Sequence, residues 1–184
     1  GASEYIELHN PTSQALDASG YSVGVWRQGK VTTWYPLSSR PCPIPAGGYH
    51  AFTTSIEGIT AFYEAPRDSL TQSKTLPQLA NKGFTIELLR HADSTVVETF
   101  RYDPGLLGKL RSQRGVALER YFSPTGDKSQ EYWGAATPQA NFATPGQRNS
   151  IQPAGGSPSD TTHRAAPLPL YITEIMARPT VDGS

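Results

Sequence analysis

The sequence predicts an all-β protein, built as a sandwich or barrel of short strands. Short runs of β-branched and aromatic residues alternate with Gly, Pro, Asn and Asp along most of the chain, a rhythm typical of such folds. Helical spacing is scarce, and the best candidate, residues 55–65, is expected to form only one or two turns before Pro66. At 184 residues the chain can build one good core, whereas a second full domain would be cramped.

The strands can be placed from alternation and turn chemistry. Residues 4–9 put Ile6 and Leu8 on one face and Glu7 on the other. A Gln28-Gly29 turn predicts a hairpin between the strands on either side of it. Further strands are expected at residues 21–25, 30–34, 49–53, 84–89, 95–102 and 116–122, with 95–102 as the antiparallel partner of 84–89.

The chain is expected to contain one domain, a linker and a separate strand. Residues 4–150 form the sandwich, and their last part, 123–150, is turn-rich with Trp133 as its anchor. Residues 151–169 are rich in Pro, Gly and Ser and have almost no large apolar side chains, which predicts a flexible linker. Residues 170–184 open with another strand, which completes this domain or begins a following repeat.

Five segments share the motifs of one known family and follow one another in its order. They are residues 4–11 (EYIELHNP), 16–21 (LDASGY), 44–49 (IPAGGY), 79–88 (LANKGFTIEL) and 143–149 (ATPGQRN). Together they resemble the lamin tail domain in the form found in bacterial multidomain proteins. The resemblance covers about residues 4–150 and implies an immunoglobulin-like sandwich. It also implies a secreted or cell-surface location for a bacterial protein.

The order of one segment departs from that family. A strand like residues 172–179 (ITEIMARP) normally precedes the strand at residues 4–9, but here it comes last. The chain is therefore either cut from a tandem array or permuted. In both cases we expect the last strand to fill a vacant sheet edge, in its own chain or by exchange with a neighbour. The pairing residues would be Tyr171, Ile172, Thr173, Glu174, Ile175 and Met176.

Composition argues against several classes of function. Sixteen basic and sixteen acidic residues balance, whereas a phosphate-binding chain needs an excess of Lys and Arg. No apolar run approaches the length of a transmembrane helix. Cys42 is the only cysteine, so no internal disulfide forms, and it is read as a packed or idle thiol.

No catalytic or metal motif is recognisable. The four histidines lack the spacing of metal ligands and are read as surface residues, and the acidic residues look dispersed. We therefore expect no catalytic, cofactor or metal site. Exposed aromatic residues could stack on sugars, but most are expected to pack in the core or at strand edges.

A local basic cluster is read first as a solvated loop, and otherwise as a site for an anionic partner. Its members are Arg101, Lys109, Arg111, Arg114 and Arg120.

The expected function is a non-catalytic interaction module of a larger multidomain protein, with a protein or neighbouring repeat as partner and a strand-exchanged dimer as one form. The alternative is an accessory domain that holds nucleic acid or carbohydrate for an attached hydrolase such as a nuclease or phosphatase. A stand-alone hydrolase built from scattered residues is the third option.

Overall fold

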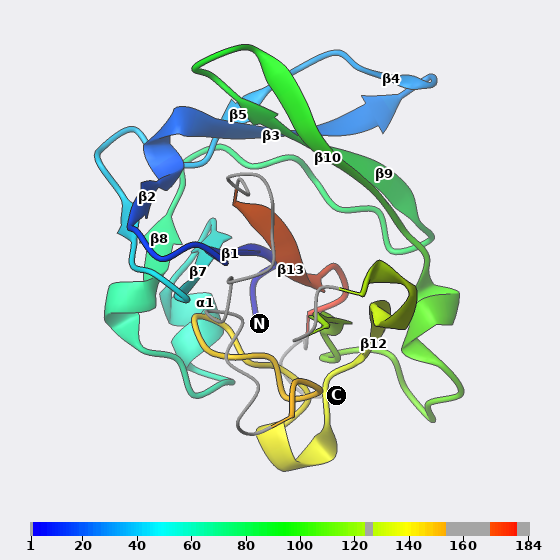
Figure 1. Cartoon of the computed structure of the whole chain (residues 1–184). Helices are drawn as coiled ribbons and strands as arrows, with labels where there is room; N and C mark the ends of the chain where they lie inside the picture. The colour runs from blue at the N-terminus through cyan, green and yellow to red at the C-terminus, as the bar shows by residue number, and fades with distance from the viewer. Residues whose placement is uncertain (1, 124–126, 154–169, 180–184) are drawn as a thin grey trace.

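The computed structural model describes residues 2–123, 127–153 and 170–179, and it confirms the all-β sandwich. Two sheets lie one above the other, as Figure 1 shows. The first has the strand order β12-β11-β13-β1-β7-β8 and the second the order β10-β9-β3-β4, with β5 also paired to β3. The immunoglobulin-like assignment stays a prediction.

The element bounds are as follows. The first sheet contains β1 Tyr5–His9, β7 Tyr49–Thr53, β8 Leu70–Gln72, β11 Leu118–Tyr121, β12 Tyr132–Ala135 and β13 Tyr171–Met176. The second contains β3 Tyr21–Arg27, β4 Lys30–Val31, β5 Tyr35–Pro36, β9 Phe84–Arg90 and β10 Thr95–Tyr102. β2 Leu16–Asp17 and β6 Pro43–Ile44 form a separate two-stranded sheet. The described part of the chain contains one short α-helix, α1 Glu57–Thr60. It also contains single 3₁₀ turns: η1 Ala18–Gly20, η2 Arg67–Ser69, η3 Pro104–Leu107, η4 Lys128–Gln130 and η5 Pro138–Ala140.

Turn residues position the second sheet as the sequence predicts. Gln28 and Gly29 both have positive φ, 54° and 85°, and they close the hairpin between β3 and β4. β10 pairs antiparallel with β9 as expected. The predicted one or two helical turns before Pro66 are confirmed by α1.

The main core lies between the sheets and draws apolar side chains from both. Ile6 and Leu8 of β1 are fully buried there, as their alternation predicts. A second apolar cluster lies on the outer face of the first sheet and contains Tyr5, Ile59 of α1 and Met176. Both faces of β1 are therefore covered, since all five of its residues are buried.

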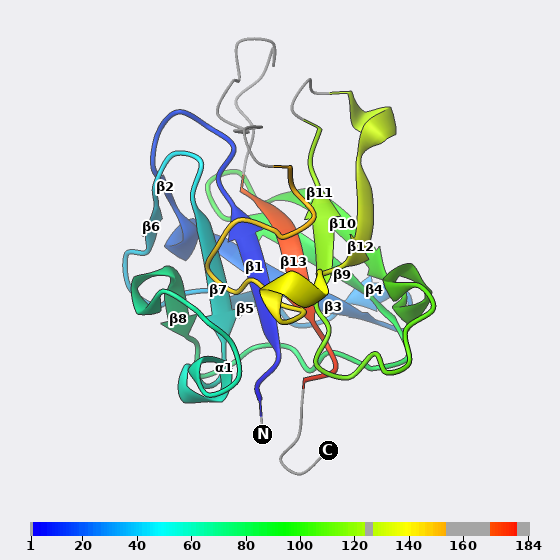
Figure 2. The same cartoon turned by 90° about the horizontal axis from the view of Figure 1, so that it is seen from below.

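The last strand pairs with its own chain, but it lies inside the sheet and not at an edge. β13 is antiparallel to β1 on one side and to β11 on the other. Figure 2 shows it between these two strands. β13 therefore fills the edge of β1 that would otherwise be vacant, as predicted, and β11 and β12 continue the sheet beyond it.

The sandwich extends slightly past its predicted boundary at residue 150. Gln152 is buried, and its side chain exchanges two hydrogen bonds, of 2.9 and 2.8 Å, with the backbone of Phe122. Most of the predicted linker, residues 154–169, lies outside the described residues, as do residues 180–184.

Candidate functional site

The candidate site is the slot between β1 and β11 that β13 occupies. All six residues of β13 are buried. Its backbone pairs on both sides, and Met176 lies opposite Tyr5 while Tyr171 lies opposite His9. Five of the six predicted pairing residues have a register partner on β1, and Thr173 is the exception. Through β13 the sheet joins β11 and β12 to the rest of the first layer.

Three glutamates form a row across the three strands of the slot. Glu174 of β13 is the register partner of Glu7 on β1 and of Glu119 on β11. All three are fully buried. We call them the carboxyl row. The prediction of dispersed acidic residues is wrong, because strand pairing joins side chains that are far apart in sequence.

The segment of residues 137–152, the covering segment, crosses the outer face of these strands, and Figure 2 shows it in yellow and orange in front of them. It gives the carboxyl row hydrogen-bond donors. The Gly146 N–H donates to Glu7 Oε2 at 2.6 Å. The Ser150 hydroxyl and the Ile151 N–H donate to Glu119 Oε2 at 2.7 and 3.0 Å.

Thr144 of the covering segment connects two members of the row. Its hydroxyl oxygen lies 2.6 Å from Glu119 Oε1 and 3.0 Å from Glu174 Oε2. Its N–H donates to Glu174 Oε1 at 3.0 Å, and the Tyr5 hydroxyl donates to the same oxygen. Glu174 is therefore held by β1 and by the covering segment together.

Burial shifts the titration of two members of the row, Glu7 and Glu174, toward neutral carboxyl groups. Loss of hydration raises the pKa of Glu174 to about 8, and the nearby Glu119 carboxylate contributes to the shift. Burial and the Glu174 charge also raise the pKa of Glu7 well above its usual range, although the Gly146 N–H opposes this. Glu7 Oε1 is buried and has no hydrogen-bond partner among the described residues.

A β-bulge accounts for the spacing of residues on β13. The register with β1 shifts between Glu7 and Leu8, which leaves Thr173 as an extra residue. As a result Ile172 and Ile175 both enter the main core. The Asn149 amide binds the bulge by donating to the Thr173 carbonyl at 3.0 Å and to its hydroxyl at 2.8 Å.

The segments that carry the family resemblance hydrogen-bond to one another. Asn10 in the first segment donates from its side chain to the Ile44 carbonyl at 2.9 Å and from its N–H to Gly48 at 2.9 Å. Glu4 accepts from the Leu79 N–H at 3.2 Å. Together with the Glu7–Gly146 bond, these contacts give the motif residues a structural role around β1.

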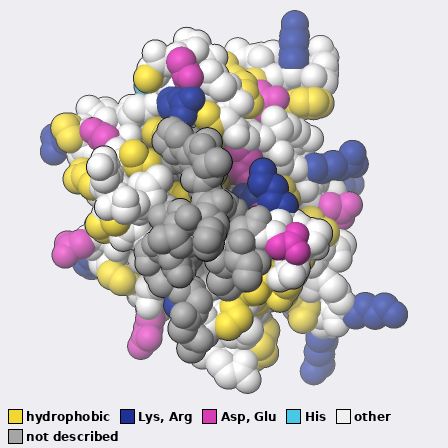
Figure 3. Space-filling view, viewed as in Figure 1, with side chains coloured by type: hydrophobic (Ala, Val, Ile, Leu, Met, Phe, Trp, Pro, Cys, Tyr) yellow, Lys and Arg dark blue, Asp and Glu magenta, His cyan; other side chains and the backbone are white. Residues whose placement is uncertain are grey.

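The predicted basic cluster divides in two. Arg101, Lys109, Arg111 and Arg114 are exposed and make no ion pair with a described residue. Figure 3 shows both basic and acidic side chains on the face that it presents.

Arg120 differs from the other four because it is part of a half-buried network. It donates to Glu98 at 2.5 Å and to Glu131 at 3.3 Å, and its guanidinium lies over the rings of Trp133 and Tyr171. Its charge is therefore neutralised within the molecule, and it is not available to an outside anion.

Two of the histidines are not surface residues. His9 and His50 are buried, and loss of hydration lowers the pKa of each to about 4. Cys42 is buried 3.6 Å from His50 Nε2, and burial raises the pKa of its thiol, which favours the unreactive form. His91 is exposed, and His163 lies outside the described residues.

The aromatic residues considered for sugar stacking are mostly packed. Tyr5 is fully buried, and Trp133 stacks on Phe100 with the ring centroids 4.0 Å apart. Trp26 and Tyr132 are the exposed exceptions, at 38% and 53% exposure.

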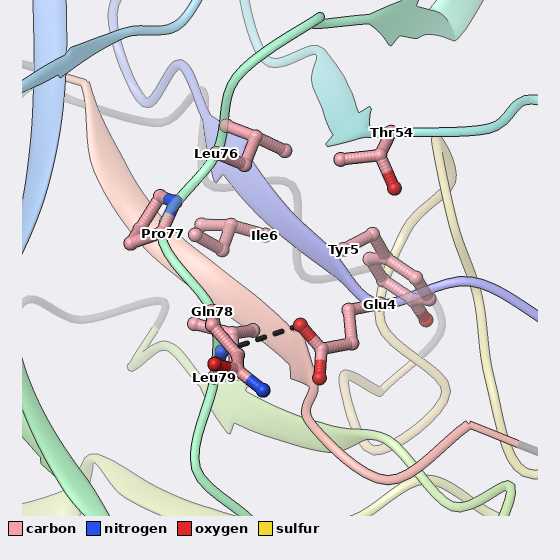
Figure 4. Close-up of a pocket in the computed structure, with 8 residues that line it drawn as sticks. All are labelled: Glu4, Tyr5, Ile6, Thr54, Leu76, Pro77, Gln78 and Leu79. Atoms are coloured by element: carbon pink, nitrogen blue, oxygen red, sulfur yellow. Dashed lines mark hydrogen bonds between the residues drawn. The ribbon is translucent and has the colours of Figure 1, made fainter.

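Two depressions lie near the first sheet. A pocket of about 230 Å³ separates the start of β1 from residues 76–79, and Figure 4 shows Glu4 at its wall, turned toward Gln78 and Leu79. Glu4 is the only carboxyl group among its lining residues. A wider groove of about 780 Å³ runs between residues 60–67 and 139–147, and Thr144 lines it.

The described ranges contain no group of three or more His, Cys, Asp or Glu side chains arranged to hold a metal ion, the carboxyl row included. No helix in the described part of the chain is long and apolar enough to span a membrane. No protein-family model, curated protein or solved structure matches the chain. The resemblance to the lamin tail domain therefore stays a prediction from its motifs.

Proposed function

We propose that this chain is a non-catalytic interaction module of a larger multidomain protein, and that β13 is the element through which it joins a neighbouring unit. The observation that carries the proposal is the double pairing of β13. β13 is buried on both faces and paired on both edges, so it joins β1 to β11 across the slot. Strand addition of this kind works within one chain or between chains, because the main-chain hydrogen bonds are the same.

The geometry of the slot allows two sources for its strand. The last residue of β13, Met176, lies opposite the first residue of β1, Tyr5. A strand that directly preceded β1 could therefore enter the same slot as the first arm of a hairpin. In a tandem array, the last strand of one unit would then belong equally well to the next unit.

The chemistry of the row supports binding over catalysis. A general acid or base has to come within hydrogen-bonding distance of its substrate. The three carboxyl groups are instead fully buried and hydrogen-bonded to the covering segment and to Tyr5. They hold the strand in place.

Strand removal and replacement test the proposal. We expect the full chain to be a monomer by light scattering, and the chain ending at residue 167 to unfold or aggregate. A peptide of residues 168–180 should restore a folded one-to-one complex, whereas the same peptide with Ile175→Asp should not, because Ile175 is fully buried. A truncated chain that stays folded and ignores the peptide would refute the proposal.

A further inference from the structure

We propose that the slot recognises an incoming strand by a glutamic acid at the register position of Glu174, and that this side chain enters with one proton shared with Glu119 through the Thr144 hydroxyl. The proposal rests on the proposed function, in which β13 is the exchanged element. It defines the partner by chemistry: a strand with two apolar core residues three positions apart and a carboxyl group just before the second.

The bulge sets the first part of this requirement. Ile172 and Ile175 both face the main core, so Thr173 and Glu174 between them both lie toward the covering segment. A strand with simple alternation would turn two of these four side chains to the wrong face. Asn149 holds the extra residue through its bonds to Thr173.

The second part of the requirement, a carboxyl group at the position of Glu174, follows from the number of protons available for hydrogen bonding. The Thr144 hydroxyl contacts a carboxyl oxygen of Glu119 and one of Glu174, but it has a single proton to donate. The other contact is a hydrogen bond only if that carboxyl group carries a proton. The remaining oxygens, Glu119 Oε2 and Glu174 Oε1, each accept two donors. Both contacts are hydrogen bonds when Glu174 Oε2 carries a proton and the Thr144 hydroxyl donates to Glu119 Oε1.

The charges around the pair agree with a neutral Glu174. The ionisable groups that act on Glu174 or Glu7 are Tyr5, Glu119 and each other, and Tyr49, His9 and Arg148 lie around them. The two register neighbours of Glu174 are both carboxyl groups, and Arg148 acts on His9 and Tyr49. Burial of Glu174 as an anion would place a further negative charge between two buried carboxyl groups.

The test is the pH dependence of the unfolding constant of the full chain, measured in urea between pH 6.5 and 7.5. The pKa of Glu174 is higher in the folded chain, so folding takes up its proton, and stability falls as the pH rises from about 4.5 to about 8. The unfolding constant should rise close to tenfold per pH unit for each such proton. The pKa values of His9 and His50 in the folded chain lie below this window, but in the unfolded chain both histidines titrate near their usual pKa of about 6.5. They bind protons only when unfolded and therefore flatten the wild-type slope at the lower end of the window. This contribution cancels in the ratio of the wild-type to the E174Q unfolding constant.

Glu174→Gln distinguishes an effect of the proton on Glu174 from an effect of the size and packing of its side chain. A glutamine can reproduce the protonated side chain, because its oxygen can accept from Tyr5 and Thr144 while its NH₂ group donates to the Thr144 hydroxyl oxygen. We expect E174Q to fold and the ratio of the wild-type to the E174Q unfolding constant to rise close to tenfold per pH unit. Exposed Glu57→Gln is the control, and its ratio to wild type should stay constant.

A constant ratio for E174Q across the window would overturn the proposal. If E174Q does not fold, the wild-type slope decides after the calculated contribution of His9 and His50 is subtracted, and a flat corrected slope overturns the proposal equally. The peptide experiment is independent of this one. A failure of the peptide to bind, with the slope present, would reject strand exchange between chains and leave a proton-coupled strand within one chain.

Discussion

Replacing Thr144 by valine removes the one hydroxyl that connects Glu119 to Glu174 while keeping the shape of the side chain. The change deletes two contacts, of 2.6 and 3.0 Å, and leaves one oxygen on each carboxyl group without its partner. A hydrogen bond to a charged group contributes about 1.5–3 kcal/mol, and an orphaned buried oxygen costs as much as the bond that satisfied it. We expect Thr144→Val to lower the free energy of unfolding by about 2–4 kcal/mol.

Urea unfolding followed by tryptophan fluorescence measures this loss, with an unchanged m-value as evidence that the folded state keeps its compactness. Thr99→Val is the matched control, because Thr99 is an exposed strand residue of β10 and the same change there should have little effect. A loss for Thr144→Val no larger than that of the control would refute the bridging role of the hydroxyl.

Two further predictions concern the residues around the slot. Gly146→Ala should lower the free energy of unfolding by about 2 kcal/mol or more, because Gly146 has a φ of 75° and an added Cβ atom would lie 2.8 Å from Ser69 Cβ. Gly29→Ala is the control for the cost of the positive φ alone, since Gly29 has a φ of 85° and open space around it. Thermal unfolding of the two variants compares these losses. Arg120→Met should lower the free energy of unfolding in urea by about 3 kcal/mol, because Glu98 and Glu131, whose side chains are 15% and 10% exposed, lose the cation that pairs with them. A loss within about 0.5 kcal/mol, the size expected for a surface substitution, would contradict this.

Local patterns predicted the parts of the fold that local physics decides. The alternation of residues 4–9 places Ile6 and Leu8 in the core, and Gln28 and Gly29 close their hairpin with positive φ as expected. These features depend on side-chain period and on turn geometry, which a few neighbouring residues determine.

The carboxyl row could not be predicted in the same way. Glu7, Glu119 and Glu174 lie on three strands whose pairing follows from the whole sheet order. The polar face of β1 also looks like a solvent face until the covering segment is placed over it. One local signal was present: the three-residue spacing of Ile172 and Ile175, which breaks strand alternation and marks the bulge.

If β13 is exchanged between units as proposed, the polar side chains of the slot restrict it to a single register, which an apolar slot could not do. Burying carboxyl groups costs free energy, and a slot lined only with aliphatic residues would bind strands more strongly but in more than one register. Here a strand shifted by one residue would place Thr173 or Ile175 at the register position of Glu174 and leave Glu119 without its carboxyl partner. The carboxyl row therefore lowers the stability of the slot but limits the bound strand to a single register. A module whose last strand can serve its own unit or the next one needs that selectivity most, because every unit in an array would present a similar edge.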